Sequence, residues 1–297
     1  MQVALTGASG LIGTALKQSL LRDGHQVRVL VRHPTSRDGD FSSDSWDPTR
    51  GLLDPNFIAD CDAIVCLSGV GVGEHRWTED YKRQIRQSRV DAVGTVARSL
   101  AEYGGPRVLV CASAVGYYGD TGDRTIDESA PPGDSFLAGV CVDWEAAADP
   151  ARSAGVRVAH MRSGLVLARA GGLLKRLAPI VKLGVAGRLG DGRQYMSWIS
   201  ITDEVAAIRF LLDHDIAGPV NLTAPTPVTN ADFTRTLGAV VGRPTVLPVP
   251  GFAARTALGE FAGELLTGQR AVPARLTEAG FAFARPDLTA ALRAELN

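Results

Sequence analysis

The feature that most constrains the fold is a series of glycines directly after a short apolar strand at the start of the chain. The sequence from Gln2 to Gly13 reads QVALTGASGLIG, and a helical pattern follows as far as Leu21. Glycines at this point are typical of the turn that begins a dinucleotide-binding fold. Gly7 allows the tight turn, Gly10 lets the backbone approach a pyrophosphate, and Gly13 lets helix and strand pack closely. Free N–H groups at the start of the helix would then face the phosphates.

The composition fits a globular protein with a sizeable core in one large or two modest domains. The chain has 297 residues, of which 45% are hydrophobic and 21% charged. Its net charge of -1 argues against a nucleic-acid or membrane-surface partner. No apolar run approaches the roughly 20 residues of a membrane span, and no leader precedes the first strand, so we expect a cytoplasmic protein. The cysteines and histidines show no metal-ligand spacing, and no metal site is expected.

Strands and helices alternate over the first two thirds of the chain. Further strands are expected at residues 26–32, 62–67, 107–113, 156–161 and 220–222, and long helices at residues 78–103 and 136–154. Near-continuous apolar strands separated by helices form a parallel sheet that is covered on both faces. We therefore predict an α/β fold, a Rossmann doubly wound parallel sheet.

The last third of the chain differs. Residues 171–192 are rich in glycine and basic residues, with one helix near residues 173–181. A helix over 204–212 is expected, with Thr202 or Asp203 as its N-cap. From residue 230, helical segments separated by prolines indicate a small lobe. We predict a nucleotide-binding domain over residues 1–225, with a substrate-side insert at about 168–197, and a mostly helical C-terminal capping lobe over 226–297.

The end of the second strand indicates which nicotinamide cofactor the site prefers. A site for NAD usually places an acid there to accept from the ribose 2′-hydroxyl. Here the strand ends with Arg32, His33 and Pro34, and no acid follows until Asp38. Arg32 can pair with a 2′-phosphate, which a carboxylate would repel. NADP(H) is therefore favoured over NAD(H); the alternative is that Arg32 is only a solvated residue at a strand end.

Two further segments carry polar side chains at expected functional positions. In the basic segment 76–89, Gln84, Ser88 and Arg89 share one helical face, which could meet the cofactor or simply be an exposed charged face. Ser113 ends the fourth strand, and Tyr117 follows it. Ser113 could bind a substrate oxygen and Tyr117 transfer its proton. The alternative is a strand cap with packing aromatics.

These motifs resemble those of extended short-chain dehydrogenases/reductases of the NAD-dependent epimerase/dehydratase family. The similarity is carried by residues 6–13, 113–119 and 198–203. Additional motifs are similar to the epimerase family proteins of atypical class 39U, which have their own C-terminal domain. They are Trp46-Asp47, Arg76-Trp77, Ser88-Arg89, Trp144-Glu145, residues 162–167, Gly171-Gly172, residues 190–194, 221–225 and 265–270, and Gly280-Phe281.

The resemblance implies that NADP(H) binds along one edge of the predicted sheet. The glycine turn contributes Gly7, Ser9, Gly10, Leu11, Ile12 and Gly13 to this binding site. Other implied contacts come from Arg32, His33, Leu67, Ser68, Gly69, Gln84, Arg89, Ser113 and Val166. Position 84 is often acidic in relatives, so Gln84 departs from the pattern.

One departure bears directly on the reaction. Members of the wider superfamily use a Tyr-x-x-x-Lys pair, and none of the five tyrosines here has a lysine four residues later. At the expected helical position the chain has Phe136 and Val140. The first hypothesis is an NADP(H)-dependent oxidoreductase or epimerase, acting on an unidentified small molecule through Ser113 and either Tyr117 or Tyr118. The second is an NADP(H) sensor or scaffold without catalysis. Either could be a monomer or a homodimer.

Overall fold

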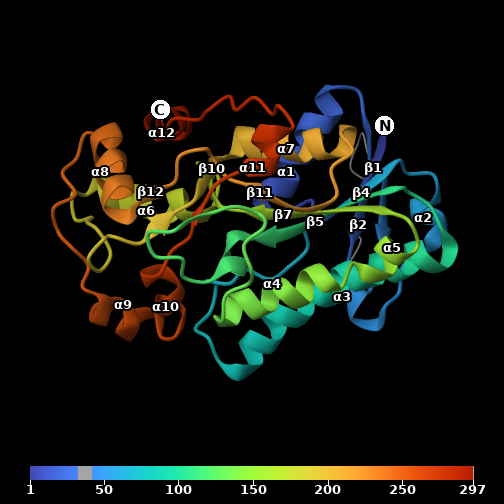
Figure 1. The fold of residues 1–297 in the computed structure, drawn as a ribbon, viewed down its shortest axis with the longest axis horizontal. Helices are drawn as coiled ribbons and strands as arrows, with labels where there is room; N and C mark the ends of the chain where they lie inside the picture. The colour runs from blue at the N-terminus through green and yellow to red at the C-terminus, as the bar shows by residue number, and fades with distance from the viewer. Residues whose placement is uncertain (33–41, 297) are drawn as a thin grey trace.

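The computed structural model describes residues 1–32 and 42–296. At its centre the described residues form a seven-stranded sheet in the order β11-β7-β5-β4-β1-β2-β3 (Figure 1). The strands are β1 (Gln2–Thr6), β2 (Gln26–Val31), β3 (Ser42–Ser45), β4 (Ala63–Cys66), β5 (Val108–Ala114), β7 (Arg157–Ser163) and β11 (Gly218–Leu222). All neighbouring strands are parallel. The predicted doubly wound α/β fold is confirmed.

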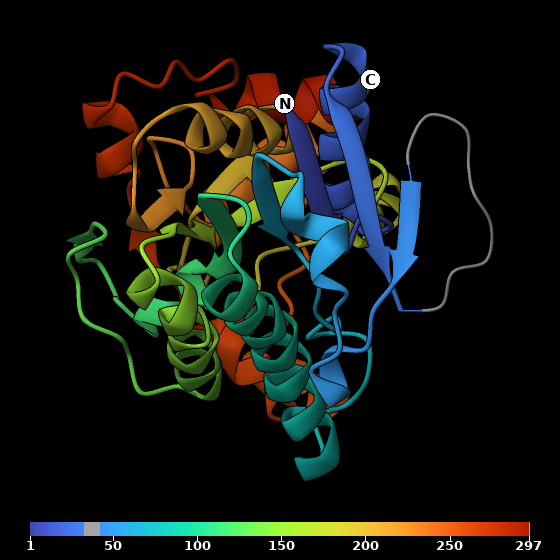
Figure 2. The ribbon, with the colours of Figure 1, turned by 90° about the vertical axis from the view of Figure 1, so that its right-hand side faces the viewer.

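Helices cover both faces of the sheet (Figures 1 and 2). One face packs against α1 (Leu11–Arg22) and α7 (Ile201–Asp213), and the other against α2 (Pro55–Ala59), α3 (Glu79–Tyr103), α4 (Phe136–Ala146) and α5 (Asp149–Ser153). Successive side chains of one strand point to opposite faces, as Val3 and Ala4 of β1 show by joining different cores. The sheet is therefore buried on both sides, which explains its near-continuous apolar strands.

Two expected helix boundaries were wrong. The helix expected over 136–154 is interrupted between α4 and α5, and Pro150, in the first turn of α5, has no N–H to donate. The N-cap of α7 is Ser200, not Thr202 or Asp203, because its hydroxyl accepts a hydrogen bond from the Asp203 N–H at 3.0 Å. The Asp203 carboxylate instead accepts from the backbone N–H groups of Ala284 and Arg285, and so holds the C-terminal segment.

The remaining elements form a mostly helical region beside the carboxyl ends of the strands. They are α6 (Gly172–Lys182), α8 (Asn230–Val241), α9 (Gly251–Leu258), α10 (Phe261–Leu266), α11 (Ala274–Glu278) and α12 (Leu288–Leu296). The helices α6, α8 and α12 share a core that contains Trp198 and Phe233. Within the described ranges, no helix combines the length and apolarity needed to cross a membrane.

Short strand pairs connect this region to the rest of the chain. They are β6 (Thr125–Ile126) with β13 (Arg270–Ala271), β8 (Leu165–Leu167) with β10 (Trp198–Ser200), and β9 (Tyr195–Met196) with β12 (Val228–Thr229). Across the loop that follows β4, Lys82 pairs with Glu260 at 2.9 Å, and Arg176 donates to the Gly73 carbonyl at 3.1 Å. The C-terminal helices therefore face the edge of the sheet at which a cofactor site is expected.

Candidate cofactor and active site

The strand order reverses between β1 and β4, and the glycine turn lies at this switch point. Ligands of open α/β sheets bind in the crevice at this position. Gly7 adopts a positive φ of 69°, and a Cβ there would lie 2.7 Å from the carbonyl carbon of Leu67. A Cβ at Gly13 would lie well under 3.0 Å from the Gly7 carbonyl oxygen. Both positions therefore require glycine, for the reasons that the sequence predicted.

The start of α1 is open to an anion. Its N-cap, Gly10, has no side chain to accept from the first-turn N–H groups, and no acidic residue lies in that turn. Ser9 and Gly10 are exposed, and Leu11 contacts Gly171 at the start of the insert. These N–H groups would hold a pyrophosphate, and the donor set of the turn fits a dinucleotide.

The end of β4 is fixed against the same turn. The Thr6 hydroxyl accepts hydrogen bonds from the N–H groups of Leu67 at 3.1 Å and Ser68 at 3.3 Å. Gly69 follows, and a Cβ there would lie 3.2 Å from the guanidinium carbon of Arg89. Leu67, Ser68 and Gly69 thus line the switch point opposite the glycine turn.

Arg89 is a partly buried cation without a carboxylate partner among the described residues. Its guanidinium donates to the Ile85 carbonyl at 2.9 Å and lies 5.0 Å from the centre of the Trp144 ring. Burial lowers the pKa of Arg89. Because an unpaired buried charge is costly, the side chain fits a binding site for an anionic or strongly polar group. The predicted contact of Arg89 with the cofactor stays a prediction.

The other predicted cofactor residues differ in their surroundings. Arg32 is exposed at the end of β2, and within the described residues it makes no ion pair. His33 lies outside the described residues. Gln84 is exposed on α3, whereas the Ser88 hydroxyl accepts from the Val70 N–H at 3.2 Å and so supports the loop after β4. Val166 lies on β8, beside Ile199 of β10.

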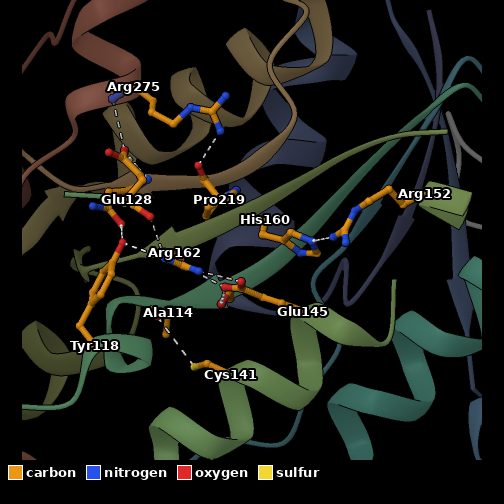
Figure 3. Close-up of polar contacts among 12 residues, drawn as sticks. Ala114, Tyr118, Glu128, Cys141, Glu145, Arg152, His160, Arg162, Pro219 and Arg275 are labelled. Atoms are coloured by element: carbon orange, nitrogen blue, oxygen red, sulfur yellow. Dashed lines mark hydrogen bonds and ion pairs between the residues drawn. The ribbon is translucent and has the colours of Figure 1, made fainter. Parts of the chain in front are cut away.

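Ser113 is brought into an ion-pair network that the sequence analysis did not foresee. In the parallel register of β5 and β7, Ser113 lies beside Arg162. Glu145 reaches both from α4. The Ser113 hydroxyl donates to Glu145 Oε1 at 2.7 Å. Arg162 donates to both carboxylate oxygens of Glu145, at 2.8 and 2.9 Å (Figure 3). Burial raises the pKa of Glu145, but the hydrogen bonds and charge of Arg162 outweigh it and hold that pKa below its usual value.

The two adjacent tyrosines have different environments. The Tyr118 hydroxyl donates to Asn221 Oδ1 at 2.7 Å and accepts from Arg162 at 3.0 Å, and burial raises the pKa of Tyr118 to about 12 (Figure 3). The ring of Tyr117 is half-buried and lies 3.4 Å from the guanidinium carbon of Arg162. Within the described residues, the Tyr117 hydroxyl makes no hydrogen bond. Its proton is therefore free for another partner, whereas the Tyr118 proton is already engaged.

Phe136 and Val140 occupy the helical positions at which the superfamily pair was sought. Phe136 packs edge-on against the ring of Trp77, with ring centres 5.0 Å apart, and Lys82 Nζ lies 5.0 Å from the Phe136 ring. Val140 is buried in the same cluster. Neither side chain can exchange a proton. Trp198 lies in the core of the C-terminal helices.

The sequence analysis also missed two buried side-chain carboxyl groups, Glu204 and Glu128, near the C-terminal ends of the strands. Glu204, in the first turn of α7, accepts from the Ser163 hydroxyl at 2.6 Å, and its other oxygen has no partner in the described structure. Burial raises the pKa of Glu204 to about 8. Glu128 accepts from the Asn221 N–H at 2.9 Å, and burial raises its pKa (Figure 3). The segments of Glu145 and Arg162 were singled out by resemblance, as Trp144-Glu145 and residues 162–167, but the sequence did not indicate that these two side chains form an ion pair.

Comparison with known proteins agrees with this geometry. The model of the NAD dependent epimerase/dehydratase family matches residues 3–223, which include the glycine turn and the Ser113 network. The chain belongs to this family. A second model, a domain of unknown function (DUF1731), matches residues 249–295. This confirms the resemblance to epimerase family proteins with their own C-terminal domain.

Several members of the epimerase family are similar over almost the whole chain. An epimerase family protein of Mycobacterium tuberculosis is 47% identical over 283 residues, covering 95% of this chain and 93% of the relative. The crystal structure of the human epimerase family protein SDR39U1 with NADPH has a TM-score of 0.89 at 32% identity, covering 99% of both chains. A nucleoside-diphosphate sugar epimerase from Corynebacterium glutamicum has a TM-score of 0.81 at 36% identity, covering all of this chain and 58% of that one.

Proposed function

We propose that this epimerase-family chain binds NADP(H) and acts as an oxidoreductase or epimerase on a small molecule with a hydroxyl or carbonyl group. The observation that carries the cofactor proposal is the unpaired guanidinium of Arg89 beside Gly69, opposite the open start of α1. These two groups offer positive charge and free N–H donors to one anionic ligand.

The preference for NADP(H) rests on Arg32. This exposed cation ends β2 without a carboxylate beside it among the described residues, so a 2′-phosphate would meet attraction there. The human relative whose structure contains NADPH supports the same choice. Structural neighbours with NAD share only the fold, such as MoeE5 at 18% identity.

The proposed chemistry uses this chain's own hydroxyl groups. When bound, the nicotinamide would supply or accept a hydride. The Ser113 hydroxyl donates a hydrogen bond to Glu145, so its oxygen has lone pairs with which to accept a hydrogen bond from a substrate hydroxyl and orient it. Glu145 fixes the direction of the Ser113 hydroxyl by accepting this hydrogen bond. Tyr117, whose hydroxyl is free, is proposed to exchange a proton with the substrate, and Tyr118 to hold Arg162 in place.

Turnover of NADPH across panels of ketones and sugar nucleotides tests this mechanism. Removing a positioned acid or base typically costs on the order of 10²–10⁴ in rate, so Ser113→Ala and Tyr117→Phe should both be slow. Tyr103→Phe, at the far end of α3, is the matched control. Unchanged turnover in both site variants would remove Ser113 and Tyr117 from the mechanism.

A specific observation also favours the second hypothesis, a sensor or scaffold. Ser113 and Tyr118 are 5% and 4% exposed, and both hydroxyl groups are already hydrogen-bonded. A hydrogen-bond network whose hydroxyl groups are buried and already paired can serve only to stabilise the fold. Tight NADPH binding without turnover on any substrate, together with a partner that binds only the loaded protein, would favour the sensor. No NADPH binding would contradict both hypotheses.

A further inference from the structure

Exposed apolar side chains are concentrated in two segments of the chain, one in the insert and one in the C-terminal lobe. The described residues contain twelve large apolar side chains that are exposed, and eight of them lie within residues 180–185 and 246–258. They are Ile180, Leu183, Val185, Val246, Leu247, Val249, Phe252 and Leu258. Leu183, Val246 and Phe252 are each more than 70% exposed, at 77%, 74% and 73%. We call these eight residues the apolar edge. A concentration of this kind marks an interaction surface, whereas single exposed apolar residues are ordinary.

The two segments of the apolar edge are held side by side by their backbones. The Val249 N–H donates to the Arg188 carbonyl at 2.9 Å, and the Gly190 N–H donates to the Val249 carbonyl at 2.9 Å. Figure 1 shows the yellow loop after α6 beside the orange chain that leads from α8 to α9. Gly187 has no room for a Cβ, because the Leu247 carbonyl lies against it. The surface is therefore built from fixed backbone contacts.

The charges within the two segments that carry the apolar edge are all of one sign. Segments 170–190 and 241–259 contain no aspartate or glutamate. Their exposed basic residues are Lys175, Arg176, Lys182, Arg188, Arg243 and Arg255. The next carboxylates along the chain are Asp191 and Glu260, and Glu260 is already paired with Lys82. A chain with a net charge of -1 thus places six exposed cations in the same two segments as its most exposed apolar side chains.

We propose that the apolar edge docks this protein onto an anionic lipid membrane surface. Apolar side chains flanked by lysine and arginine are the features of segments that lie in the headgroup region, with the cations held by anionic lipids. A second copy fits less well, since a two-fold interface would place the same cations against each other. The expectation of no membrane partner came from the net charge of the whole chain. The local charges of the apolar edge instead favour an anionic membrane as partner.

Sedimentation with vesicles tests the proposal on the full chain. We expect binding to phosphatidylcholine vesicles that contain about one third phosphatidylglycerol, little binding to phosphatidylcholine alone, and loss of binding in high salt. Lys182→Glu with Arg255→Glu should weaken binding at least about 25-fold, at roughly fivefold for each charge removed. Leu183→Ser with Phe252→Ser should also weaken it.

The matched control is Tyr103→Ser with Arg107→Glu, an exposed aromatic and an exposed cation far from the apolar edge. It should bind vesicles like the unmodified chain, and unchanged thermal unfolding shows that each variant is folded. The proposal is overturned if anionic vesicles are not bound or if the control weakens binding as much as the edge variants. The proposal is also overturned if the chain binds acidic proteins but not vesicles. It is overturned equally if the chain forms a dimer and the double variant Leu183→Ser with Phe252→Ser abolishes that dimer. None of these readouts requires a bound cofactor.

Discussion

Arg162 and Glu145 form a two-point ion pair that is almost closed to solvent, with side chains 4% and 12% exposed. Arg162 comes from the end of β7 and Glu145 from α4, so the pair joins the sheet to the helix that covers it. Ser113 donates to the same carboxylate. The position of the proposed substrate-binding hydroxyl therefore depends on this pair.

Replacement of Arg162 by methionine should reduce the free energy of unfolding by about 3–5 kcal/mol, because the Glu145 carboxylate then remains buried without its partner. Glu145→Leu combined with Arg162→Met should be less destabilising than Arg162→Met alone, since no unpaired charge remains. Urea denaturation measures both free energies. Arg83→Met is the control: its ion pair with Asp80 is exposed, and its loss should change stability by less than about 0.5 kcal/mol. Equal effects of Arg162→Met and Arg83→Met would contradict the role of the buried pair.

Replacement of Arg32 by aspartate should reverse the cofactor preference. The change removes an attraction to the 2′-phosphate and introduces repulsion, so NADPH should bind about 10- to 100-fold more weakly, while NADH binding is kept or improved. Fluorescence titration with each cofactor gives the ratio of dissociation constants. Arg107→Asp removes an exposed cation that precedes the start of β5, whereas Arg32 follows the end of β2, so this control should leave the ratio unchanged. An unchanged ratio in Arg32→Asp would assign the 2′-phosphate to another residue.

The sequence predicted the parts of the fold that depend on local pattern. The periodicity of apolar residues and the spacing of glycines predicted the strands β1, β2, β4, β5 and β7, the long helix α3 and the turn around Gly7. Each of these elements is determined by residues that are close together in the sequence. The strand β3 was missed, since the polar sequence Ser42–Ser45 has no strand pattern and pairs only at the edge of the sheet. Tertiary pairing there overrode local propensity.

The candidate site was less predictable, because its geometry comes from distant segments. Ser113 was predicted as a site residue, but its hydrogen bond to Glu145 was not, because this contact is set by the register of β5 and β7 and by the docking of α4. Glu128 was not predicted as a site residue, yet its carboxylate is buried and accepts from the backbone N–H groups of Asn221 and Arg275. The periodicity of a sequence does not predict contacts between segments that are far apart in the chain.

Replacement of Gly13 by alanine should weaken NADPH binding and lower the free energy of unfolding by about 1–3 kcal/mol. The added Cβ would overlap the Gly7 carbonyl oxygen, so α1 must shift away from the turn. Isothermal titration and urea denaturation measure the two effects. Gly263→Ala in α10 is matched in chemistry but has no atom within 4 Å of its new Cβ, and it should be neutral or slightly stabilising. If Gly13→Ala behaves like Gly263→Ala, helix and strand are not in close contact.

Replacement of Glu204 by glutamine should remove a pH dependence of stability. Burial raises the pKa of Glu204 to about 8, so the carboxyl group is protonated in the folded chain and ionised in the unfolded chain between about pH 4.5 and pH 8. The unfolded state then binds fewer protons, and the stability of the unmodified chain should fall as pH rises through this window. Relative to Glu204→Gln, the fall should approach about 1.4 kcal/mol per pH unit.

The difference between Glu204→Gln and the unmodified chain isolates this group from His160. Burial lowers the pKa of His160 to about 4, so its contribution has the opposite sign: stability rises with pH up to about pH 6.5, where the unfolded imidazole loses its proton. That contribution is common to both proteins and cancels in the difference. Urea denaturation across pH 4.5–8 should therefore show Glu204→Gln gaining relative stability at every step. A constant difference over this range would show that Glu204 is ionised in the folded protein.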